Sequence, residues 1–597
     1  MNAYINGTPC EFTEGETILQ AARRSHVFIP TLCHFAPLGH KPGTCRVCAV
    51  EVRDDAGGTQ MLTACNTPMQ EGMQVFTRTE KVRAHQRLQV ELLFADHDQN
   101  CIACARHGSC ELQDLGEFVG LSTNRFAPRI ASDRPFDDTM RGMVRDMSKC
   151  VRCLRCIDVC RNVQGVAALT VDGTGPNAYV GVGMAEDQNT SVCIQCGQCI
   201  LVCPTGALAE RDQNDEVLEF IADPKIKTVF TFASSVRVVL GEEFGMQPGE
   251  NTEGKIVAAL RRIGADIVLD TDFAADVTIM EEGTELLDRM RNKGVLPMFT
   301  SCCPGWVSYA EKHFPQGLPH LSTTRSPQGI FGSLAKTYLP KQMGIPAENL
   351  RVVSIMPCTA KKVEAARPQL SSQLGPDTDV VITVREFARL LRRCGINLAE
   401  VEPEPFDNPF MSDSTGAGVI FGTTGGVMEA ALRTVYAKLN GKELAGIEIA
   451  PVRGSEGLRE AEIDLGEGGK IKVAVCFGLA NARKLLEQAV KGDSPYAFIE
   501  VMACPGGCVD GGGTPRVKND YLPRKNNRQD GLYSIDRGMP RRQSHNNPQV
   551  KRLYDEFLGE PNSHLAHELL HTSYASRSKL LTESISQAKQ RVTLTDR

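Results

Sequence analysis

Two runs of closely spaced cysteines constrain this chain more than any other feature of its sequence. Both have the form C-x2-C-x2-C-x3-C; the first comprises Cys150, Cys153, Cys156 and Cys160, and the second Cys193, Cys196, Cys199 and Cys203. This spacing binds two [4Fe–4S] clusters, and the fourth cysteine of each run binds the cluster of the other run. We therefore expect one cluster on Cys150, Cys153, Cys156 and Cys203, and the other on Cys193, Cys196, Cys199 and Cys160.

The rest of the composition fits a large cytoplasmic protein. The 597 residues include 23 cysteines, and clustered cysteines in a chain of this size indicate metal binding rather than a disulfide scaffold. The net charge of -6 argues against a nucleic-acid partner. No apolar run is long enough to span a bilayer, and the first residues read as a strand and a turn rather than a signal peptide. We expect no membrane partner.

Two further groups of ligands precede the runs. Cys33, Cys45, Cys48 and Cys65 have the spacing C-x11-C-x2-C-x16-C, which is related to that of plant-type [2Fe–2S] sites, although a structural zinc site could also use four cysteines. His97, Cys101, Cys104 and Cys110 follow as H-x3-C-x2-C-x5-C. From spacing alone, this second group could hold either zinc or a [4Fe–4S] cluster.

The distribution of cysteines and of apolar periodicity divides the chain into five parts. We expect a small β-rich domain over 1–78, a His/Cys3 domain over 79–140, the domain of the cysteine runs over 141–215, a large α/β domain over 216–560 and a polar, helical tail over 561–597. In the large domain, strands at 228–233, 267–270 and 295–300 alternate with helices at 255–263 and 282–291. This alternation predicts parallel sheets. The fold class is therefore multidomain, α+β followed by α/β.

Three segments of the α/β domain carry the remaining clustered cysteines. They are residues 300–306 (TSCCPGW), 356–364 (MPCTAKKVE) and 500–513 (EVMACPGGCVDGGG). Loops at the ends of parallel strands converge on one edge of a sheet. The cysteines offer soft ligands for iron, and the glycines allow the backbone to approach a bulky cofactor closely. The three segments therefore predict one buried cofactor site.

These segments resemble the signature motifs of the iron–iron hydrogenases almost residue for residue. The four cluster sites precede them in the order found in that family, and the resemblance covers about residues 1–575. The segments TLCH and GTCRVC around Cys33 and Cys45 also resemble the N-terminal domain of complex I large subunits. The resemblance implies a β-grasp ferredoxin-like [2Fe–2S] domain, a His-ligated [4Fe–4S] domain, a bacterial 2[4Fe–4S] ferredoxin domain and a two-lobed α/β domain that holds an H-cluster.

The resemblance also implies a role for each matched residue of the H-cluster site. The [4Fe–4S] part would be bound by Cys303, Cys358, Cys504 and Cys508. Cys508 would also bridge to a two-iron subsite that carries CO, cyanide and an amine dithiolate. Lys361 would donate a hydrogen bond to a cyanide, and Cys302 would carry protons to the bridging amine. The cavity would be lined by Ala233, Ser235, Pro327, Gln328, Met356, Phe421 and Met502.

Some residues depart from this pattern or lie outside it. Ser234, Gly329, Asp510 and Thr514 are unusual for the family. Our hypothesis is that they tune the polarity of the cavity or its sensitivity to oxygen, because none of them replaces a ligand. Cys10, Cys394 and Cys476 belong to no motif, and we expect them to be buried packing residues.

A proton route is indicated on one predicted helix. Glu282, Glu285 and Arg289 are spaced for one helical face, a pattern that a solvated, salt-bridged surface would also show. By the resemblance, Glu282, Glu285 and Ser322 match the relay residues of the family. This implies the order Arg289, Glu285, Ser322, Glu282, Cys302, with water filling the gaps. Glu281 and Asp288 are assigned to the solvated face.

The partners follow from the resemblance alone. The N-terminal domain and the tail are similar to those of catalytic subunits of NAD(P)-linked, often electron-bifurcating, hydrogenases. This implies H2, protons, ferredoxin, maturation proteins and separate flavin/NAD(P)-binding and [2Fe–2S] subunits as partners. The alternatives are an electron-relay subunit like the complex I large subunit, an H2 sensor and an iron–sulfur assembly protein.

The tail contains one misleading motif. Residues 567–571 (HELLH) fit the zinc-protease pattern H-E-x-x-H. The same residues also resemble the ordinary ending of hydrogenases that work in multi-subunit complexes. We therefore expect a helix that docks on the catalytic domain or on a partner subunit.

Overall fold

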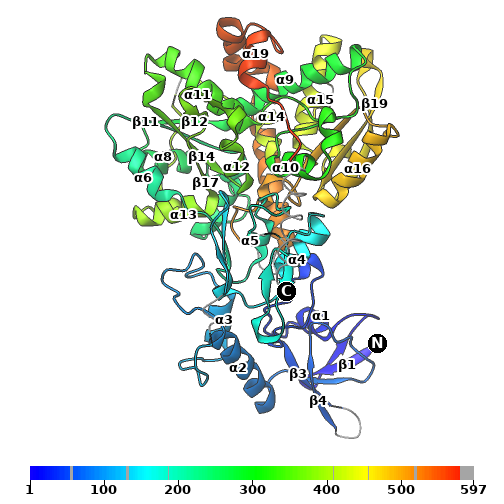
Figure 1. Cartoon of the computed structure of the whole chain (residues 1–597). Helices are drawn as coiled ribbons and strands as arrows, with labels where there is room; N and C mark the ends of the chain where they lie inside the picture. The colour runs from blue at the N-terminus through cyan, green and yellow to red at the C-terminus, as the bar shows by residue number, and fades with distance from the viewer. Residues whose placement is uncertain are drawn as a thin grey trace, which may run out of the picture.

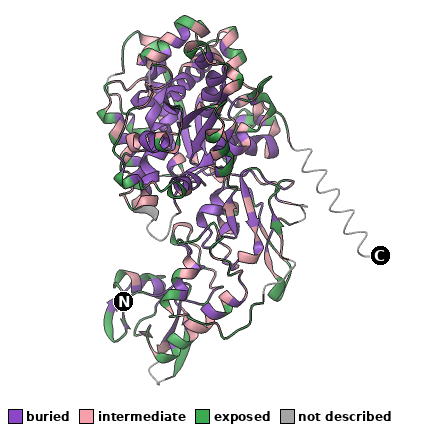
Figure 2. Cartoon of the chain, turned by 90° about the vertical axis from the view of Figure 1, so that its left-hand side faces the viewer, coloured by how far each residue is buried: buried purple, intermediate pink, exposed green. Residues whose placement is uncertain are grey.

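The computed structural model describes residues 1–53, 58–129, 134–183, 185, 187–407, 409–444, 446–454, 456–516 and 521–577. The N-terminal sheet lies at one end of the molecule, the large α/β part lies at the other, and the cysteine runs lie between them (Figure 1). Buried residues are concentrated in the α/β part (Figure 2). None of the helices within these ranges has the length and apolar character needed to cross a membrane.

The N-terminal part is a mixed sheet of five strands with the order β2-β1-β5-β3-β4. A helix, α1 (Ile18–Arg24), packs on it and begins at Thr17, whose side chain accepts a hydrogen bond from the backbone of Gln20. Ala64 bonds to the backbone of Cys48, which ties two of the cysteine segments together. The strands are β1 (Asn2–Ile5), β2 (Thr8–Glu11), β3 (Ala49–Arg53), β4 (Thr59–Thr63) and β5 (Gln74–Phe76).

The middle of the chain consists of short elements. The two cysteine runs form the helices α4 and α5, which pack on each other, and a small sheet with the order β10-β7-β6 closes one side. The elements are α2 (Glu80–Ala95), α3 (Glu111–Phe118), β6 (Phe136–Asp137), β7 (Met143–Asp146), α4 (Arg155–Asp158), β8 (Thr170–Asp172), β9 (Tyr179–Gly181), α5 (Gln198–Val202) and β10 (Leu208–Glu210).

The α/β part has two lobes, each built on a four-stranded sheet. The first sheet, β12-β11-β14-β17, is entirely parallel. The second, β13-β20-β19-β18, is parallel except for the antiparallel edge strand β18. The strands are β11 (Lys227–Phe232), β12 (Ile267–Asp270), β13 (Met298–Phe299), β14 (Leu350–Met356), β17 (Val380–Thr383), β18 (Leu458–Asp464), β19 (Lys470–Phe477) and β20 (Phe498–Met502), and a small hairpin adds β15 (Ser371–Ser372) and β16 (Gly375–Pro376).

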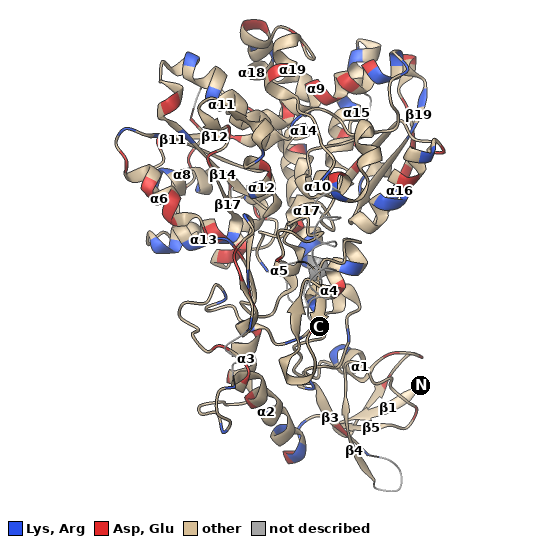
Figure 3. Ribbon diagram, viewed as in Figure 1, with Lys and Arg blue, Asp and Glu red and all other residues tan. Residues whose placement is uncertain are grey.

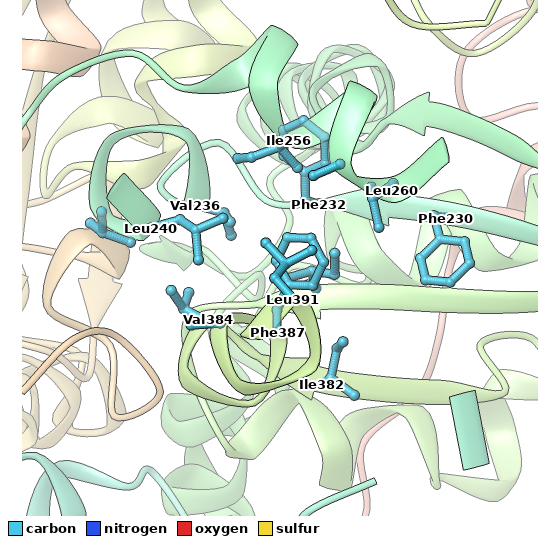
Figure 4. Packing of buried hydrophobic residues seen from close by; sticks show 14 of the residues in the cluster. Phe230, Phe232, Val236, Leu240, Ile256, Leu260, Ile382, Val384, Phe387 and Leu391 are labelled. Carbon is cyan, nitrogen blue, oxygen red and sulfur yellow. The ribbon is translucent and has the colours of Figure 1, made fainter. Parts of the chain in front are cut away.

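Helices cover both sheets, and α9 runs between the lobes (Figure 1). On the first lobe, Phe230 and Phe232 pack against Ile256 of α8 and Phe387 of α13 in a dry core (Figure 4). Along the outer helices, basic and acidic residues are interspersed (Figure 3). The helices are α6 (Asn214–Ala222), α7 (Val236–Val239), α8 (Glu253–Ile263), α9 (Thr271–Arg291), α10 (Pro304–His313), α11 (Pro327–Met343), α12 (Ala360–Ala365), α13 (Val384–Arg393), α14 (Gly416–Val419), α15 (Gly426–Asn440), α16 (Leu479–Lys491), α17 (Tyr521–Gly538), α18 (Pro548–Leu553) and α19 (His564–Leu570).

Three expected elements differ in extent. The helix expected at 282–291 begins already at Thr271, where the Asp270 side chain accepts the N–H of Asp272. The strand expected at 295–300 is only Met298–Phe299, because Pro297 cannot donate a ladder hydrogen bond. The tail is helical in α19, and residues 578–597 of the expected helical tail lie outside the described residues.

Candidate functional site: a cysteine-lined cavity between two lobes

The three cysteine segments meet at one cavity between the lobes. Residues 302–303 follow β13, residue 358 follows β14, and residues 504–508 follow β20. Because the three strands end at facing sheet edges, their loops converge. The volume of this cavity is about 80 Å³. Of the residues proposed from sequence, the structure places these in its wall: Cys302, Cys303, Cys358, Cys504, Cys508, Lys361, Ala233, Pro327, Gln328, Met356, Phe421 and Met502.

One proposed lining residue lies elsewhere, and others were missed. Ser235 is buried behind the wall, and its hydroxyl has no hydrogen-bond partner within the described ranges. Its neighbour Ser234 lines the cavity instead. Two residues that were not predicted from the sequence, Thr271 and Asp272, also line the cavity from the start of α9. Their position directly after the buried strand β12 was the available signal.

Burial holds the cavity cysteines in the thiol form when no metal is bound. It raises the pKa of Cys358 to about 12 and also raises the pKa of Cys303, Cys504 and Cys508. A cationic iron cluster would reverse this by stabilising the thiolates. Burial, and next the charge of Glu282, likewise raise the pKa of Cys302. Cys302 is therefore suited to carry a proton.

Lys361 places a positive charge in the wall of the cysteine-lined cavity. Its ammonium donates to Glu364 Oε2 at 2.7 Å, to Ser326 Oγ at 2.8 Å and to the Cys302 carbonyl at 3.3 Å. Gln328 donates to the same carboxylate oxygen at 3.0 Å. The Glu364 carboxylate, seated behind the wall, thus orients both side chains towards the cavity.

The four unusual residues do not act alike. Ser234 lines the cavity. Gly329 lies against Arg325, whose Cβ would be 3.2 Å from an added Cβ. Asp510 pairs with Arg528 at 3.0 Å, and the Thr514 hydroxyl donates to the Gly511 carbonyl at 2.9 Å. Of the four, only Ser234 lines the cavity, so the hypothesis of tuned cavity polarity stays a prediction that concerns Ser234 directly.

The two cysteine runs enclose two smaller cavities. One is lined by Cys150, Cys153, Cys156 and Cys203, and the other by Cys160, Cys193, Cys196 and Cys199. Each therefore combines three cysteines of one run with the fourth of the other, which is the grouping expected from the spacing. Their remaining walls are mostly apolar, which suits a buried cluster.

The four N-terminal cysteines form one buried group. Cys33 is hydrogen-bonded to Cys45 and Cys65, and Cys48 is hydrogen-bonded to Cys65. Among the described residues, no three or more metal-ligating side chains are spaced for a single metal ion. In an iron–sulfur cluster the ligands are divided among two or four irons, so the whole set stands farther apart than the ligands of one ion.

The next proposed ligand set has one buried imidazole. His97 is buried, and its Nδ1 has no hydrogen-bond partner in the described part of the chain. Burial lowers the pKa of His97 to about 4, which keeps the ring in the neutral form that binds metals. Cys110 is buried, and Cys101 and Cys104 are half-buried. Gly206 gives Cys104 room, because an added Cβ would come within 2.4 Å of its Sγ.

Proposed ligands of neighbouring clusters pack together. One buried cluster of side chains contains Cys33, Cys45, Cys110 and Cys153, which belong to three different proposed sites. At the other end, Gly305 lies between Cys196 and Cys303, and an added Cβ would be 3.6 Å from Cys196 Cβ and 4.0 Å from Cys303 Sγ. The proposed ligand sets therefore form a continuous series that ends at the large cavity.

The proposed proton-route residues form a chain of contacts beside Cys302. Arg289 donates to Glu285 Oε1 at 2.7 Å, and Ser322 Oγ donates to Glu285 Oε2 at 2.8 Å. Glu282 is hydrogen-bonded to Ser322, and burial followed by the charge of Glu285 raises its pKa to about 8. Its Oε2 has no hydrogen-bond partner within the described ranges. The Glu282 carboxyl is therefore a buried acid.

The expectation for one neighbouring residue, Glu281, is wrong, and that for Asp288 holds in part. Glu281 does not lie on a solvated face; it is fully buried, because Tyr554 and His571 provide hydrogen-bond partners for its carboxylate. Asp288 is partly buried beside Asn562.

The three cysteines outside the motifs were expected to be buried. Cys10 and Cys476 are buried, but Cys394 is exposed, because it caps the surface end of α13.

Comparisons with protein families match most of the chain. The C-terminal domain of the iron-only hydrogenase large subunit matches residues 226–512, and the iron hydrogenase small subunit matches residues 522–577. A 2Fe-2S iron–sulfur cluster binding domain matches residues 1–80. The iron–sulfur binding region of NADH-ubiquinone oxidoreductase-G matches residues 86–125, and a 4Fe-4S binding domain matches residues 187–209.

Individual relatives extend this similarity to nearly the full length. The NADP-reducing hydrogenase subunit HndD of Solidesulfovibrio fructosivorans is 44% identical, over 96% of this chain and 99% of that protein. Iron hydrogenase 1 of Clostridium pasteurianum is 39% identical, over 96% and 99%. A cytosolic iron–sulfur assembly component 3 of Bos taurus is 31% identical, over 79% and 97%.

A solved structure of an apo variant of [FeFe]-hydrogenase HydA1 from Chlamydomonas reinhardtii is 40% identical. It aligns with a TM-score of 0.54 over 61% of this chain and 98% of that one. The chain therefore belongs to the iron-only hydrogenases, oxidoreductases that act on H2 at an H-cluster and relay electrons through [2Fe–2S] and [4Fe–4S] clusters.

Proposed function

We propose that Cys303, Cys358, Cys504 and Cys508 would hold the [4Fe–4S] part of the H-cluster and that Cys508 would also help to hold its two-iron subsite. The observation that carries this proposal is the single cavity in which all four thiols meet. The walls of this cavity fit the cluster, because the four thiols share one space, the rest of the lining is mostly apolar and the cation Lys361 is part of the wall. The bound cluster supplies the iron chemistry that interconverts H2 with two protons and two electrons.

The protein's own part in catalysis is to position and move protons. Cys302 would pass protons between the protein and the bound cluster, and Glu282 would reprotonate Cys302. With a pKa of about 8, Glu282 holds a proton at neutral pH and can still release it, which suits a general acid. Ser322, Glu285 and Arg289 connect Glu282 to the surface, with water closing the remaining gaps.

Lys361 has a separate role in this proposal. Its ammonium would donate a hydrogen bond to a cyanide of the bound two-iron subsite, and Glu364 holds the ammonium in place at 2.7 Å. The apolar side chains Ala233, Pro327, Met356, Phe421 and Met502 exclude water from the same space. Gln328 offers a polar edge, and Ser235 supports the wall from behind.

Electrons travel through four accessory clusters. We assign the [2Fe–2S] cluster to a β-grasp domain over 1–78, the His97 cluster to 79–140 and the two ferredoxin clusters to 141–215. The catalytic domain then spans 216–560, and the tail begins at 561. The packing of Cys110 and Cys153 near Cys33, and of Cys196 near Cys303, supports this order.

We further propose that the chain is the H2-converting subunit of a cytoplasmic complex linked to NAD(P) and ferredoxin. The relative at 44% identity is named as an NADP-reducing hydrogenase subunit. No described segment of this chain carries a nicotinamide or flavin motif, so other subunits would supply those cofactors. Anaerobic affinity purification from native cells tests the proposal: a co-purified flavoprotein supports it, and a single chain with full ferredoxin-linked activity contradicts it.

The catalytic assignment is tested by anaerobic infrared spectroscopy on protein matured with the H-cluster assembly machinery. Bands of metal-bound CO and cyanide are expected, together with H2 evolution that collapses in Cys302→Ala. Fully loaded accessory clusters without these bands or activity would instead identify an electron-relay protein. The similarity to a cytosolic iron–sulfur assembly component makes an assembly protein the second candidate. An assembly protein would also lack these infrared bands and H2 evolution.

A further inference from the structure

The two histidines of the HELLH segment lie beside the proposed proton route. His571 is only 6% exposed, whereas His567 is exposed, and their ring centroids are 4.1 Å apart. Both ring nitrogens of His571 have partners: Nε2 lies 3.0 Å from Glu281 Oε2, and Nδ1 lies 2.8 Å from Thr323 Oγ1. Each partner adjoins a relay residue, because Glu281 precedes Glu282 and Thr323 follows Ser322.

Glu281 is the anchor of this arrangement on α9. Its side chain is fully buried, and a buried carboxylate needs hydrogen-bond donors. The donors come from the C-terminal part of the chain: the Tyr554 hydroxyl, the Asn562 N–H at 2.8 Å and the His571 ring. The segment 554–571 is therefore fixed to the helix that carries the relay carboxylates.

The same segment also holds the loop 321–325. Arg325 N–H donates to the Leu570 carbonyl, and Thr572 N–H donates to the Thr323 carbonyl, each at 2.8 Å. The Tyr574 hydroxyl donates to the Ser322 carbonyl at 2.9 Å. The backbone on both sides of the proposed relay serine is thus bonded to residues near position 571.

The loop in turn faces Glu285. Ser322 Oγ donates to Glu285 Oε2 at 2.8 Å, and the Thr323 N–H donates to both carboxylate oxygens at 3.0 and 3.2 Å. The contacts therefore form a circuit that leaves α9 at Glu281, passes through His571 and Thr323, and rejoins α9 one helical turn later at Glu285.

We propose that His571 is a positioning residue of the proton route: with Glu281 and Thr323 it fixes the loop 321–325 against α9, so that Ser322 and the Thr323 N–H face the Glu285 carboxylate. This inference rests on the proposed roles of Ser322 and Glu285. Proton transfer requires donor and acceptor at hydrogen-bond distance. Breaking the circuit lets Ser322 move away while every proposed cluster ligand stays in place.

The test compares two substitutions of one residue. Thr323→Val keeps the shape of the side chain and removes Oγ1, whereas Thr323→Ser keeps the hydroxyl. From the loss of one hydrogen bond, we expect the valine variant to evolve H2 from a reduced dye about five- to tenfold more slowly, and the serine variant to stay within about twofold of the wild type. The solvent deuterium isotope effect should rise in the valine variant alone. A smaller fraction of active enzyme would leave that ratio unchanged.

Amide hydrogen exchange gives a readout that does not depend on the H-cluster. In the full chain before insertion of the two-iron subsite, Thr323→Val and His571→Gln should speed exchange across residues 321–325. The control His567→Gln removes the exposed histidine and should change neither exchange nor H2 evolution. If the wild type lacks H2 evolution, the proposed function fails, and the exchange rates alone then decide on the circuit.

Three results would overturn the inference. One is a valine variant with the rate and isotope effect of the wild type, and another is valine and serine variants that are equally slow. The third is exchange across residues 321–325 that is the same in Thr323→Val, His571→Gln and the wild type.

Discussion

Gly512 packs directly on Gly197, so closely that a Cβ at position 512 would lie 2.5 Å from the Cα of Gly197. Gly197 follows Cys196 of the second cysteine run, and Gly512 belongs to the loop of Cys508. The Gln198 side chain adds a hydrogen bond to the Asp510 carbonyl at 2.8 Å. This contact joins the last accessory cluster site to the catalytic cavity.

Gly512→Ala should separate these two segments. The added methyl group meets backbone, which no rotamer change can relieve, so we expect a loss of about 1–3 kcal/mol of stability. H2 evolution should fall as well, because the last accessory cluster moves away from the cavity. Thermal unfolding and dye-linked activity measure both effects. Gly538→Ala is the control, since an added Cβ there has no atom within 4 Å, and equal behaviour of the two variants would contradict the prediction.

Glu282→Gln should affect activity and stability in opposite directions at high pH. Burial, and next the charge of Glu285, raise the pKa of Glu282 to about 8 from an ordinary 4.5. The stability that this group contributes is thus fully present below pH 4.5 and is lost as the pH rises through 8. Glutamine cannot ionise and avoids this loss, but it also cannot pass a proton on.

We therefore expect the glutamine variant to lose about 100-fold or more of its activity, yet to become more stable relative to the wild type as the pH is raised. Thermal unfolding midpoints at acidic and alkaline pH, with dye-linked H2 evolution, are the measurements. A stability difference that does not change with pH would show that Glu282 is not a buried acid.

Lys361→Ala should destabilise the protein through Glu364. Both side chains are buried, and the substitution leaves the Glu364 carboxylate without its ammonium partner. Removing one partner of a buried pair costs about 3–5 kcal/mol. The double variant Lys361→Ala/Glu364→Gln should regain most of that stability but not the H2-evolving activity. Equal unfolding temperatures for the single and double variants would count against this pairing.

Cys394 should react with iodoacetamide in the native protein, because its side chain is exposed. Cys10 and Cys476 are buried and should react only after unfolding, and burial further raises the pKa of Cys476. Peptide mass spectrometry distinguishes the three sites. Cys394→Ser should abolish the labelling without changing H2 evolution. Labelling of Cys476 at the same rate would contradict the described packing.

The cluster cysteines could be predicted because their information is local. In the run from Cys150 to Cys160, the spacing indicates that the first three cysteines bind one cluster. It also indicates that Cys160 and Cys203 each bind the cluster of the other run. The comparisons confirm the family, the enzyme class and the kinds of cluster. Parallel sheets were predictable for the same reason, since the segments of β11 and β12 alternate with amphipathic helices in the sequence.

Burial of polar groups could not be predicted, because it depends on distant partners. Glu281 looked solvated on its own helix, but its partners Tyr554 and His571 lie 273 and 290 residues away. Cys394 faces outward at the end of α13, and the two arginines directly before it, Arg392 and Arg393, were the local signal of that exposure. Asp272 lines the cavity only because α9 starts eleven residues earlier than its charged face indicated, at Thr271 rather than at Glu282.

The contacts of the loop 321–325 with residues 570–574 also set an order during protein synthesis. Tyr574 follows Ser322 by 252 residues, and ribosomes add about 5–20 residues per second. The loop is therefore made roughly 10–50 s before the residues that hold it. All proposed cluster ligands, up to Cys508, emerge before His571. A growing chain thus contains every proposed cluster ligand before it contains the residues that hold the proposed proton route in place.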